Sequence, residues 1–415
     1  MRLLTLIAFG ALFYGCSSTA EQKLKTGWWR GEITLQGQKL PFNFEVTHDA
    51  EGGYDAFLKN LDERLKLEDI SFQDDSVIFR MHIFDTELKA KIEGDSLKGY
   101  YIKNFEKNYR LPFKATVGQD FRFGKTSSSL PDFNGKYAVT FSNPDETTVA
   151  VGIFQQKDQG LIGTFLTPTG DYRYLEGNVD NGHLNLSTFD GHHAFLFSAA
   201  KSGDTLRGDY WSGKSFHQQW IGIKNDSAKL PDAESLTYLK KGFDKIDFSF
   251  PDVDGKAVSP SDGKFKNKVL ILQIFGTWCP NCMDETKFLS QWYKDNQDRG
   301  VEILGLAYER NDNFEYASGR VKKMKEKLDV NYDFVIAGTY DKKKASETLP
   351  MLNEVLAFPT TIFIGKDGKV KHIRTGFEGP GTGIYYEQFK QRFNDMVNEL
   401  LSKDLASGKE NALTK

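Results

Sequence analysis

The sequence predicts an all-β region in the N-terminal half of the chain and an α/β domain in the C-terminal half. From residue 27 to about 225, short runs alternate apolar and polar side chains, turn signals separate them, and no helical periodicity of useful length intervenes. After about residue 240, continuously apolar strands alternate with amphipathic helices, which is typical of an α/β sandwich. At 415 residues, the chain also exceeds what one hydrophobic core usually serves.

The N-terminus predicts a secretion signal. One Arg precedes an apolar run from Leu3 to Gly15, which is too short for a transmembrane helix of about 20 residues but suits a signal peptide. The run ends in "FYGC", which resembles the lipobox of bacterial lipoproteins. This resemblance implies a signal peptide over residues 1–15, a lipid that attaches Cys16 to a membrane, and a polar tether over 16–26. Ser17 after the cysteine favours the outer membrane by the same analogy.

This N-terminus predicts a periplasm-facing lipoprotein of the cell envelope, where disulfides persist. The chain has three cysteines, so lipidation of Cys16 leaves only Cys279 and Cys282, and we expect no framework of structural disulfides. The net charge is −3, with 54 basic and 57 acidic side chains. We therefore expect no nucleic acid as a partner.

The all-β region contains an internal repeat, which predicts two tandem β modules over 27–123 and 130–225. "WWRGEITL" corresponds to "DFNGKYAV", and "GDSLKGYY" corresponds to "GDTLRGDYW", in the same chain order. Each module has room for seven or eight short strands, so we expect a small antiparallel barrel or sandwich that resembles a lipocalin-like sheet. A single larger sheet shared by both halves is the alternative. We expect His192 and His193, in the second module, to be polar surface residues rather than metal ligands.

The α/β domain is predicted over 240–402, after a polar linker, and a polar tail over 403–415 follows it. Its expected elements, in chain order, are a buried strand at 268–276, a helix at 281–297, a buried strand at 301–309, an amphipathic helix at 320–330, a hairpin at 360–376 and a helix at 385–401. The hairpin turns at Asp367-Gly368.

Cys279 and Cys282 form a CxxC motif where the first buried strand meets the first helix. A structural zinc site needs four ligands, and neither a second Cys pair nor a nearby His is present, so we expect no metal here. At a helix N-terminus, unpaired N–H groups and the helix dipole favour the thiolate of Cys279. Cys282 lies one turn inside the helix, where its thiol can close a disulfide. The motif therefore predicts redox chemistry.

The segments "FSFPDVDGKAVS", "GTWCPNCMDE", "FPTTIFIGKDGKV" and "RTGFEGPGTG" cover residues 243 to about 400. In this span the chain resembles the TlpA/ResA-like thiol-disulfide oxidoreductases, which have a thioredoxin fold. The resemblance implies an enzyme in which Cys279 is the attacking thiol and Cys282 the resolving thiol. It implies no cofactor beyond the redox-active Cys279–Cys282 disulfide.

The resemblance also assigns a tuning residue. Glu285 matches the glutamate that adjusts thiol pKa and proton transfer in this family, and an exposed helix carboxylate is the alternative reading. Gln273 occupies the position that is acidic in thioredoxin, which leaves Glu285 as the better candidate for a buried proton acceptor.

The predicted substrate-binding residues surround the CxxC motif. Pro359 matches the cis-proline that lines the substrate groove and keeps metal out of the dithiol, and Trp278 matches the aromatic residue before the motif. The complete predicted set is Trp278, Pro280, Asn281, Phe358, Pro359 and Thr360.

These assignments favour an envelope reductase of protein disulfides, supplied with electrons by a membrane donor protein. A disulfide oxidase or isomerase is the alternative direction. A peroxiredoxin is a second alternative, because "FSFPDVDGK" also resembles that family, but Gly276 occupies the position where peroxidatic chemistry needs a Thr. A third alternative is a lipoprotein whose β modules bind a ligand or partner while the redox domain is accessory.

Overall fold

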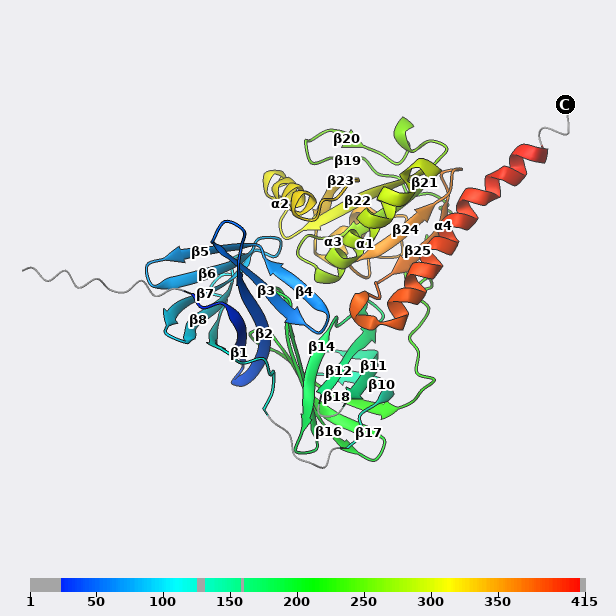
Figure 1. Cartoon of the computed structure of the whole chain (residues 1–415). Coiled ribbons are helices and arrows are strands. Elements are labelled where there is room, and N and C mark those ends of the chain that lie inside the picture. The colour runs from blue at the N-terminus through cyan, green and yellow to red at the C-terminus, as the bar shows by residue number, and fades with distance from the viewer. Residues whose placement is uncertain (1–23, 125–130, 158–159, 411–415) are drawn as a thin grey trace, which may run out of the picture.

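The computed structural model describes residues 24–124, 131–157 and 160–410. Within these ranges the strands form two nine-stranded sheets, a five-stranded sheet and a two-stranded ribbon. Figure 1 shows the two large sheets as separate bodies, with the five-stranded sheet and its helices beside them. The alternative of one sheet shared by both β modules is therefore wrong.

The first β module is an antiparallel meander that curls into an open barrel. β1 pairs with β2 on one side and with β9 on the other. The two end strands of the sheet, β4 and β5, are consecutive in the chain and joined by Glu68, so the ends of the sheet meet there. Its strands are β1 (Gly27–Leu35), β2 (Gln38–His48), β3 (Tyr54–Asn60), β4 (Glu63–Leu67), β5 (Asp69–Gln73), β6 (Ser76–Met81), β7 (Thr86–Glu93), β8 (Ser96–Lys103) and β9 (Arg110–Val117).

The second β module closes completely. β11 pairs with both β10 and β12, which joins eight strands in a ring, and the two-residue strand β13 adds to the edge of β12. Its strands are β10 (Gly135–Ser142), β11 (Thr147–Lys157), β12 (Gly160–Thr167), β13 (Gly170–Asp171), β14 (Leu175–Asp180), β15 (His183–Phe189), β16 (Ala194–Ser202), β17 (Thr205–Ser212) and β18 (Phe216–Lys224).

Alternating side chains build a separate hydrophobic core in each module. Trp29, Phe42 and Phe44 are fully buried in the first, and Phe141, Phe165 and Trp220 stack edge to face in the second. Both modules contain more strands than the seven or eight expected. In the first module the reason is that two-residue turns join short strands, as between β3 and β4 and between β5 and β6.

The C-terminal region has a thioredoxin-like fold, as expected. Its sheet has the order β23-β22-β21-β24-β25, in which the first three strands are parallel and the last two antiparallel. Its strands are β21 (Val269–Phe275), β22 (Val301–Glu309), β23 (Asp333–Thr339), β24 (Thr360–Ile364) and β25 (Val370–Thr375), and its α-helices are α1 (Pro280–Asn296), α2 (Phe314–Lys327), α3 (Lys342–Thr348) and α4 (Ile384–Glu410). Shorter elements are β19 (Phe250–Pro251), β20 (Ala257–Val258) and the 3₁₀ turns Gly263–Phe265, Gln297–Arg299 and Pro380–Thr382.

All residues of β21 and β22 are buried, because helices cover both faces of the sheet. Helix α4 continues to Glu410, beyond the boundary that we predicted at residue 402. Among the described residues, no helix combines the length and the apolar character needed to cross a membrane.

Candidate active site

The CxxC motif lies where the fully buried strand β21 ends and helix α1 begins. Cys279 is the N-cap residue of α1, with an extended backbone, and Pro280 occupies the first turn, where a missing N–H costs nothing. The N–H of Cys282 donates to Sγ of Cys279 over 3.2 Å. The helix N-terminus therefore directs a backbone donor at the first sulfur.

The two thiols differ in their surroundings. Both are free in the structure; Cys279 is 7% exposed, whereas Cys282 is completely buried. Sγ of Cys279 lies 3.5 Å from the carbonyl oxygen of Phe358. Burial, followed by the hydrogen bond with Cys279, raises the pKa of the Cys282 thiol well above its usual value. Cys282 therefore needs a proton acceptor before it can act as a nucleophile.

Glu285 lies one turn past Cys282 and is only 1% exposed. Its carboxylate accepts hydrogen bonds from Nε2 of Gln273 (2.9 Å) and from Oγ1 of Thr361 (2.7 Å). Burial raises the pKa of Glu285 to about 7, although these two hydrogen bonds favour the charged form. The alternative reading of Glu285 as an exposed helix carboxylate is wrong.

Gln273 fixes the position of this carboxylate. It is fully buried on β21, and its side-chain oxygen accepts a hydrogen bond from the hydroxyl of Tyr332 over 3.0 Å. Because that oxygen is already occupied, the amide nitrogen is turned toward Glu285. The Gln273 side chain thus orients the proton acceptor that we predicted at Glu285.

Phe358, Pro359 and Thr360 lie opposite the motif. The Phe358–Pro359 peptide bond is cis, which is the isomer that the resemblance implied. The ring of Phe358 meets that of Trp278 edge to face at 5.5 Å, and Nε1 of Trp278 donates to the carbonyl oxygen of Tyr308 over 2.9 Å. The structure therefore brings these predicted residues together around Cys279. Thr360 is fully buried, and its hydroxyl bonds the carbonyl oxygen of Ala357.

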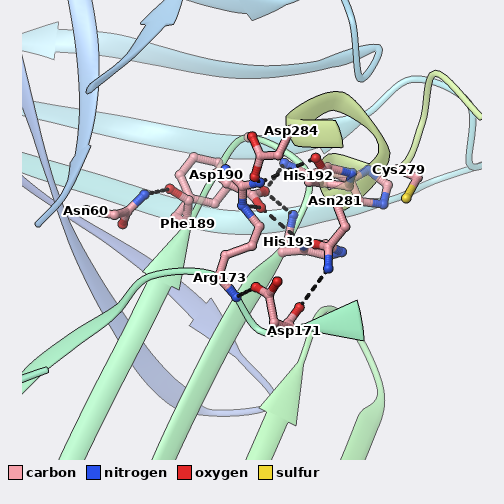
Figure 2. A network of polar contacts seen from close by, with 12 residues as sticks. Asn60, Asp171, Arg173, Phe189, Asp190, His192, His193, Cys279, Asn281 and Asp284 are labelled. Carbon is pink, nitrogen blue, oxygen red and sulfur yellow. Dashed lines mark hydrogen bonds and ion pairs between the residues drawn. The ribbon is translucent and has the colours of Figure 1, made fainter. Parts of the chain in front are cut away.

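Asn281 faces the second β module instead, whereas Pro280 lines a cavity beside α1. Nδ2 of Asn281 donates to the carbonyl oxygen of Asp171 over 3.0 Å, and Figure 2 shows this contact between the CxxC helix and the module. Oδ2 of Asp171 also accepts from the N–H of Gly379 over 2.7 Å. The amide of Asn281, which we predicted to bind substrate, is thus engaged within the chain.

A family model described as the AhpC/TSA family matches residues 243–373. Thiol-disulfide oxidoreductase ResA of Bacillus thuringiensis subsp. konkukian is 30% identical over 132 residues, which cover 32% of this chain and 68% of that relative. ResA of Geobacillus thermodenitrificans is 31% identical over 140 residues, which cover 34% of this chain and 72% of the relative. The chain belongs to the ResA family of thiol-disulfide oxidoreductases.

Part of the chain also resembles solved structures. A thiol:disulfide interchange protein of the thioredoxin family from Chlorobium tepidum aligns over 39% of this chain and 98% of its own length. The two sequences are 23% identical in that alignment, and the TM-score is 0.30.

Arg173 of the oxidoreductase, which we did not predict from the sequence, connects all three folded parts at the CxxC helix. Its guanidinium forms ion pairs with Glu63 of β4, with Asp190 after β15 and with Asp284 of α1. Nη1 also lies 3.3 Å from the carbonyl oxygen of Pro280. Figure 2 shows Arg173 between Asp190 and Asp284. Only 4% of this arginine is exposed.

A second missed residue, Glu309, holds the loop before Cys279. Its carboxylate at the end of β22 accepts from the N–H and from the hydroxyl of Thr277, each over 2.8 Å. Burial raises the pKa of Glu309. A Glu at the carboxyl end of a buried parallel strand was the one sequence signal that could have identified it.

The paired histidines are only partly exposed, so they are less accessible than the surface residues that we expected. His192 is partly buried between the rings of Phe84 and Phe105, and burial lowers its pKa well below the usual value. Nδ1 of His193 lies 3.0 Å from Oδ2 of Asp190, within the Arg173 network. The pair faces the interface because the loop after β15 packs against the first β module.

Cys16, the signal peptide and most of the tether lie outside the described residues. No group of three or more His, Cys, Asp or Glu side chains suited to a metal occurs in residues 24–124, 131–157 and 160–410.

Proposed function

We propose that this oxidoreductase reduces disulfides of other proteins in the cell envelope. In this direction, the Cys279 thiolate attacks a substrate disulfide, forms a mixed disulfide and releases the first substrate thiolate. The Cys282 thiolate then attacks the Cys279 sulfur and releases the second substrate thiolate. The enzyme is left with a Cys279–Cys282 disulfide and the substrate with two thiols.

The observation that carries the reducing direction is the environment of Cys282. A strong oxidant stabilises its reduced dithiol, which makes the disulfide ready to accept electrons. Here the buried Cys282 has a raised thiol pKa, and no cation among the described residues bonds its sulfur. Burial therefore gives the Cys282 thiolate no stabilisation in the reduced form, so a disulfide oxidase or isomerase is the less supported direction.

Glu285 supplies the proton transfer that this direction requires. Its carboxyl group, with a pKa of about 7, is poised to take the proton from Cys282 when the mixed disulfide is resolved. It can return that proton when the disulfide is reduced again. The pair of a buried thiol and a buried carboxyl one helical turn apart supports catalysis at neutral pH.

The envelope location and the electron donor are part of the same proposal. The lipobox-like "FYGC" supports a lipid on Cys16 and a position facing the periplasm, with the outer membrane favoured. Each catalytic cycle consumes two electrons, so a dithiol protein associated with a membrane would reduce the Cys279–Cys282 disulfide again.

The redox potential of the full-length protein tests the direction. We expect equilibration with dithiothreitol to give a value near the potential of thioredoxin, about −270 mV, because the Cys282 thiolate is not stabilised in the reduced form. The fraction of free thiol is measured by alkylation and mass shift. A value near −120 mV, typical of the oxidant DsbA, would overturn the reductase assignment.

A further inference from the structure

A cavity of about 360 Å³ lies where the three folded parts meet, directly beside the CxxC helix. One wall is the face of α1 that presents Pro280, Met283, Asp284 and Lys287. Another wall belongs to the first β module, and Arg173, Lys327 and Leu328 also line the cavity. Pro280 follows the attacking cysteine in sequence, so whatever occupies this cavity lies within a few residues of the reactive sulfur.

The wall from the first β module is the edge of a strand. Five consecutive residues, Arg64–Glu68, line the cavity. Successive side chains of a strand point to opposite faces of the sheet. Consecutive residues can therefore line the same cavity only if the backbone edge of the strand borders that cavity. β4 ends the order of its sheet, with β3 as its partner on the other side, because the barrel is open between β4 and β5. This edge is therefore available for pairing.

The backbone groups on this edge can be assigned from the hairpin. β3 and β4 are joined by the two residues Leu61 and Asp62, and Asn60 pairs with Glu63. In such a hairpin, the residues that flank the turn exchange both hydrogen bonds, and the pattern alternates along the strand. Arg64 and Lys66 consequently direct their N–H and C=O groups away from β3, toward the cavity.

The other residues that line the cavity favour a bound segment that carries an apolar side chain close to an acidic side chain. Leu58, Leu65, Met81, Ile83 and Met283 supply apolar surface. The carboxylates of Asp190 and Asp284 are paired with Arg173, and Nζ of Lys287 lies 3.7 Å from Oδ1 of Asp284. Lys327 adds a further positive charge to the lining. Oε2 of Glu68 is buried and has no hydrogen-bond partner among the described residues, although Oε1 accepts from the N–H of Ile83. An occupant that donates a hydrogen bond would satisfy it.

We propose that the free edge of β4 and this cavity bind an extended segment of the disulfide-bearing substrate. The segment adds to β4 as a further strand, places an apolar side chain in the cavity and directs an acidic side chain toward Lys287 and Lys327. This inference rests on the proposed activity toward protein disulfides. It gives the first β module a role in substrate selection next to the CxxC helix.

The test uses the reduced full-length protein and two synthetic peptides, each with one cysteine activated as a mixed disulfide with pyridine-2-thiol. One peptide carries Leu and Glu beside the cysteine, and the other carries Ser and Lys at the same positions. The Cys279 thiolate attacks the peptide sulfur, a mixed disulfide forms, and pyridine-2-thione leaves with a proton. Absorbance of the thione gives the rate. The neutral small molecule 2,2′-dipyridyl disulfide reports the intrinsic reactivity of Cys279.

We expect wild-type protein to react at least tenfold faster with the Leu/Glu peptide than with the Ser/Lys peptide. Lys66→Pro removes the outward N–H and should slow the Leu/Glu peptide at least fivefold, with the dipyridyl disulfide rate unchanged. Lys66→Ala keeps that N–H and serves as the matched control, with a rate near wild type. Lys327→Glu leaves the strand intact and should reduce the preference for the Leu/Glu peptide at least threefold.

Equal rates with both peptides in wild-type protein would overturn the inference. The inference would also be overturned if Lys66→Pro and Lys66→Ala reacted with the Leu/Glu peptide at the same rate and Lys327→Glu kept the wild-type ratio of the two peptide rates. If wild-type protein does not react with dipyridyl disulfide, the proposed activity itself fails, which is a different result from loss of peptide preference.

Discussion

At the scale of single residues, Glu285 determines how the site responds to pH. The carboxyl group is buried beside Cys282, and its pKa is raised from 4.5 to about 7. In the unfolded chain the same group titrates near 4.5, so the folded protein binds this proton more tightly. The folded protein is therefore less stable against unfolding when Glu285 is ionised than when it is protonated.

This proton linkage predicts a pH-dependent stability. Between pH 4.5 and about 7, the folded state holds a proton that the unfolded state has lost, so the free energy of unfolding decreases as pH rises through this window. Ionisation of this group lowers the free energy of unfolding by roughly 3 kcal/mol, and the decrease is complete above about pH 7. Glu285→Gln should abolish it. Urea unfolding followed by tryptophan fluorescence at pH 5 and pH 8 measures the difference.

The control for this prediction is Glu387→Gln, which changes an exposed carboxylate on α4. It should leave the pH dependence of wild-type protein in place. A Glu285→Gln variant whose stability difference from wild type is the same at both pH values would contradict the linkage.

At the scale of elements, the hairpin loop between β12 and β14 contacts the loop that follows β25. A Cβ atom added to Gly376 would lie 3.0 Å from the carbonyl carbon of Thr169 and 3.1 Å from the nitrogen of Gly170. Gly376 also has a φ of +77°, where glycine is favoured. This glycine thus permits the second β module to approach the redox domain closely.

Gly376→Ala should loosen this docking. Gly368 provides the matched control, because its φ of +74° is nearly the same, while its added Cβ would meet only the end of Lys245 at 4.0 Å. Both variants carry the same backbone strain, and only Gly376→Ala meets the neighbouring module. We expect faster amide hydrogen exchange at residues 168–174 in Gly376→Ala than in Gly368→Ala. Equal exchange in both variants would show that the close contact does not hold the loop.

Elements whose signals are local were predictable, and contacts between distant elements were not. The apolar run of β21 followed by CxxC predicted the strand, the helix and both thiols, because neighbouring residues determine that geometry. The role of Arg173 depends on Asp284, which lies 111 residues away in sequence. "GDYRYLEG" has the composition of an ordinary turn, so its place beside Pro280 and Asn281 had no sequence signal.

At the scale of the whole molecule, Arg173 is the residue through which all three parts interact. It is buried with the carboxylates of Glu63, Asp190 and Asp284, one from each part. Removing the cation leaves three buried acidic groups close together. Breaking a buried ion pair in this way typically costs about 3–5 kcal/mol, because a buried charge remains uncompensated.

Arg173→Met should therefore separate the parts or destabilise the whole chain. We expect a larger radius of gyration in small-angle X-ray scattering, together with a lower midpoint of thermal unfolding. Lys91→Met, which removes the exposed pair with Asp75, is the control and should leave the scattering and the midpoint of thermal unfolding near those of wild type. Identical scattering and unfolding for wild type and Arg173→Met would contradict this role.

In each β module the first strand pairs with the last strand, and this pairing affects how whole modules can be inserted or deleted during evolution. Trp29 of β1 pairs with Val117 of β9, and Tyr137 of β10 pairs with Lys224 of β18. The chain therefore enters and leaves each barrel at the same place. A unit with adjoining ends can be inserted, copied or deleted while the flanking chain keeps its path. Barrels in front of a redox domain can thus be gained or lost as whole units, each loss removing one wall around the CxxC helix.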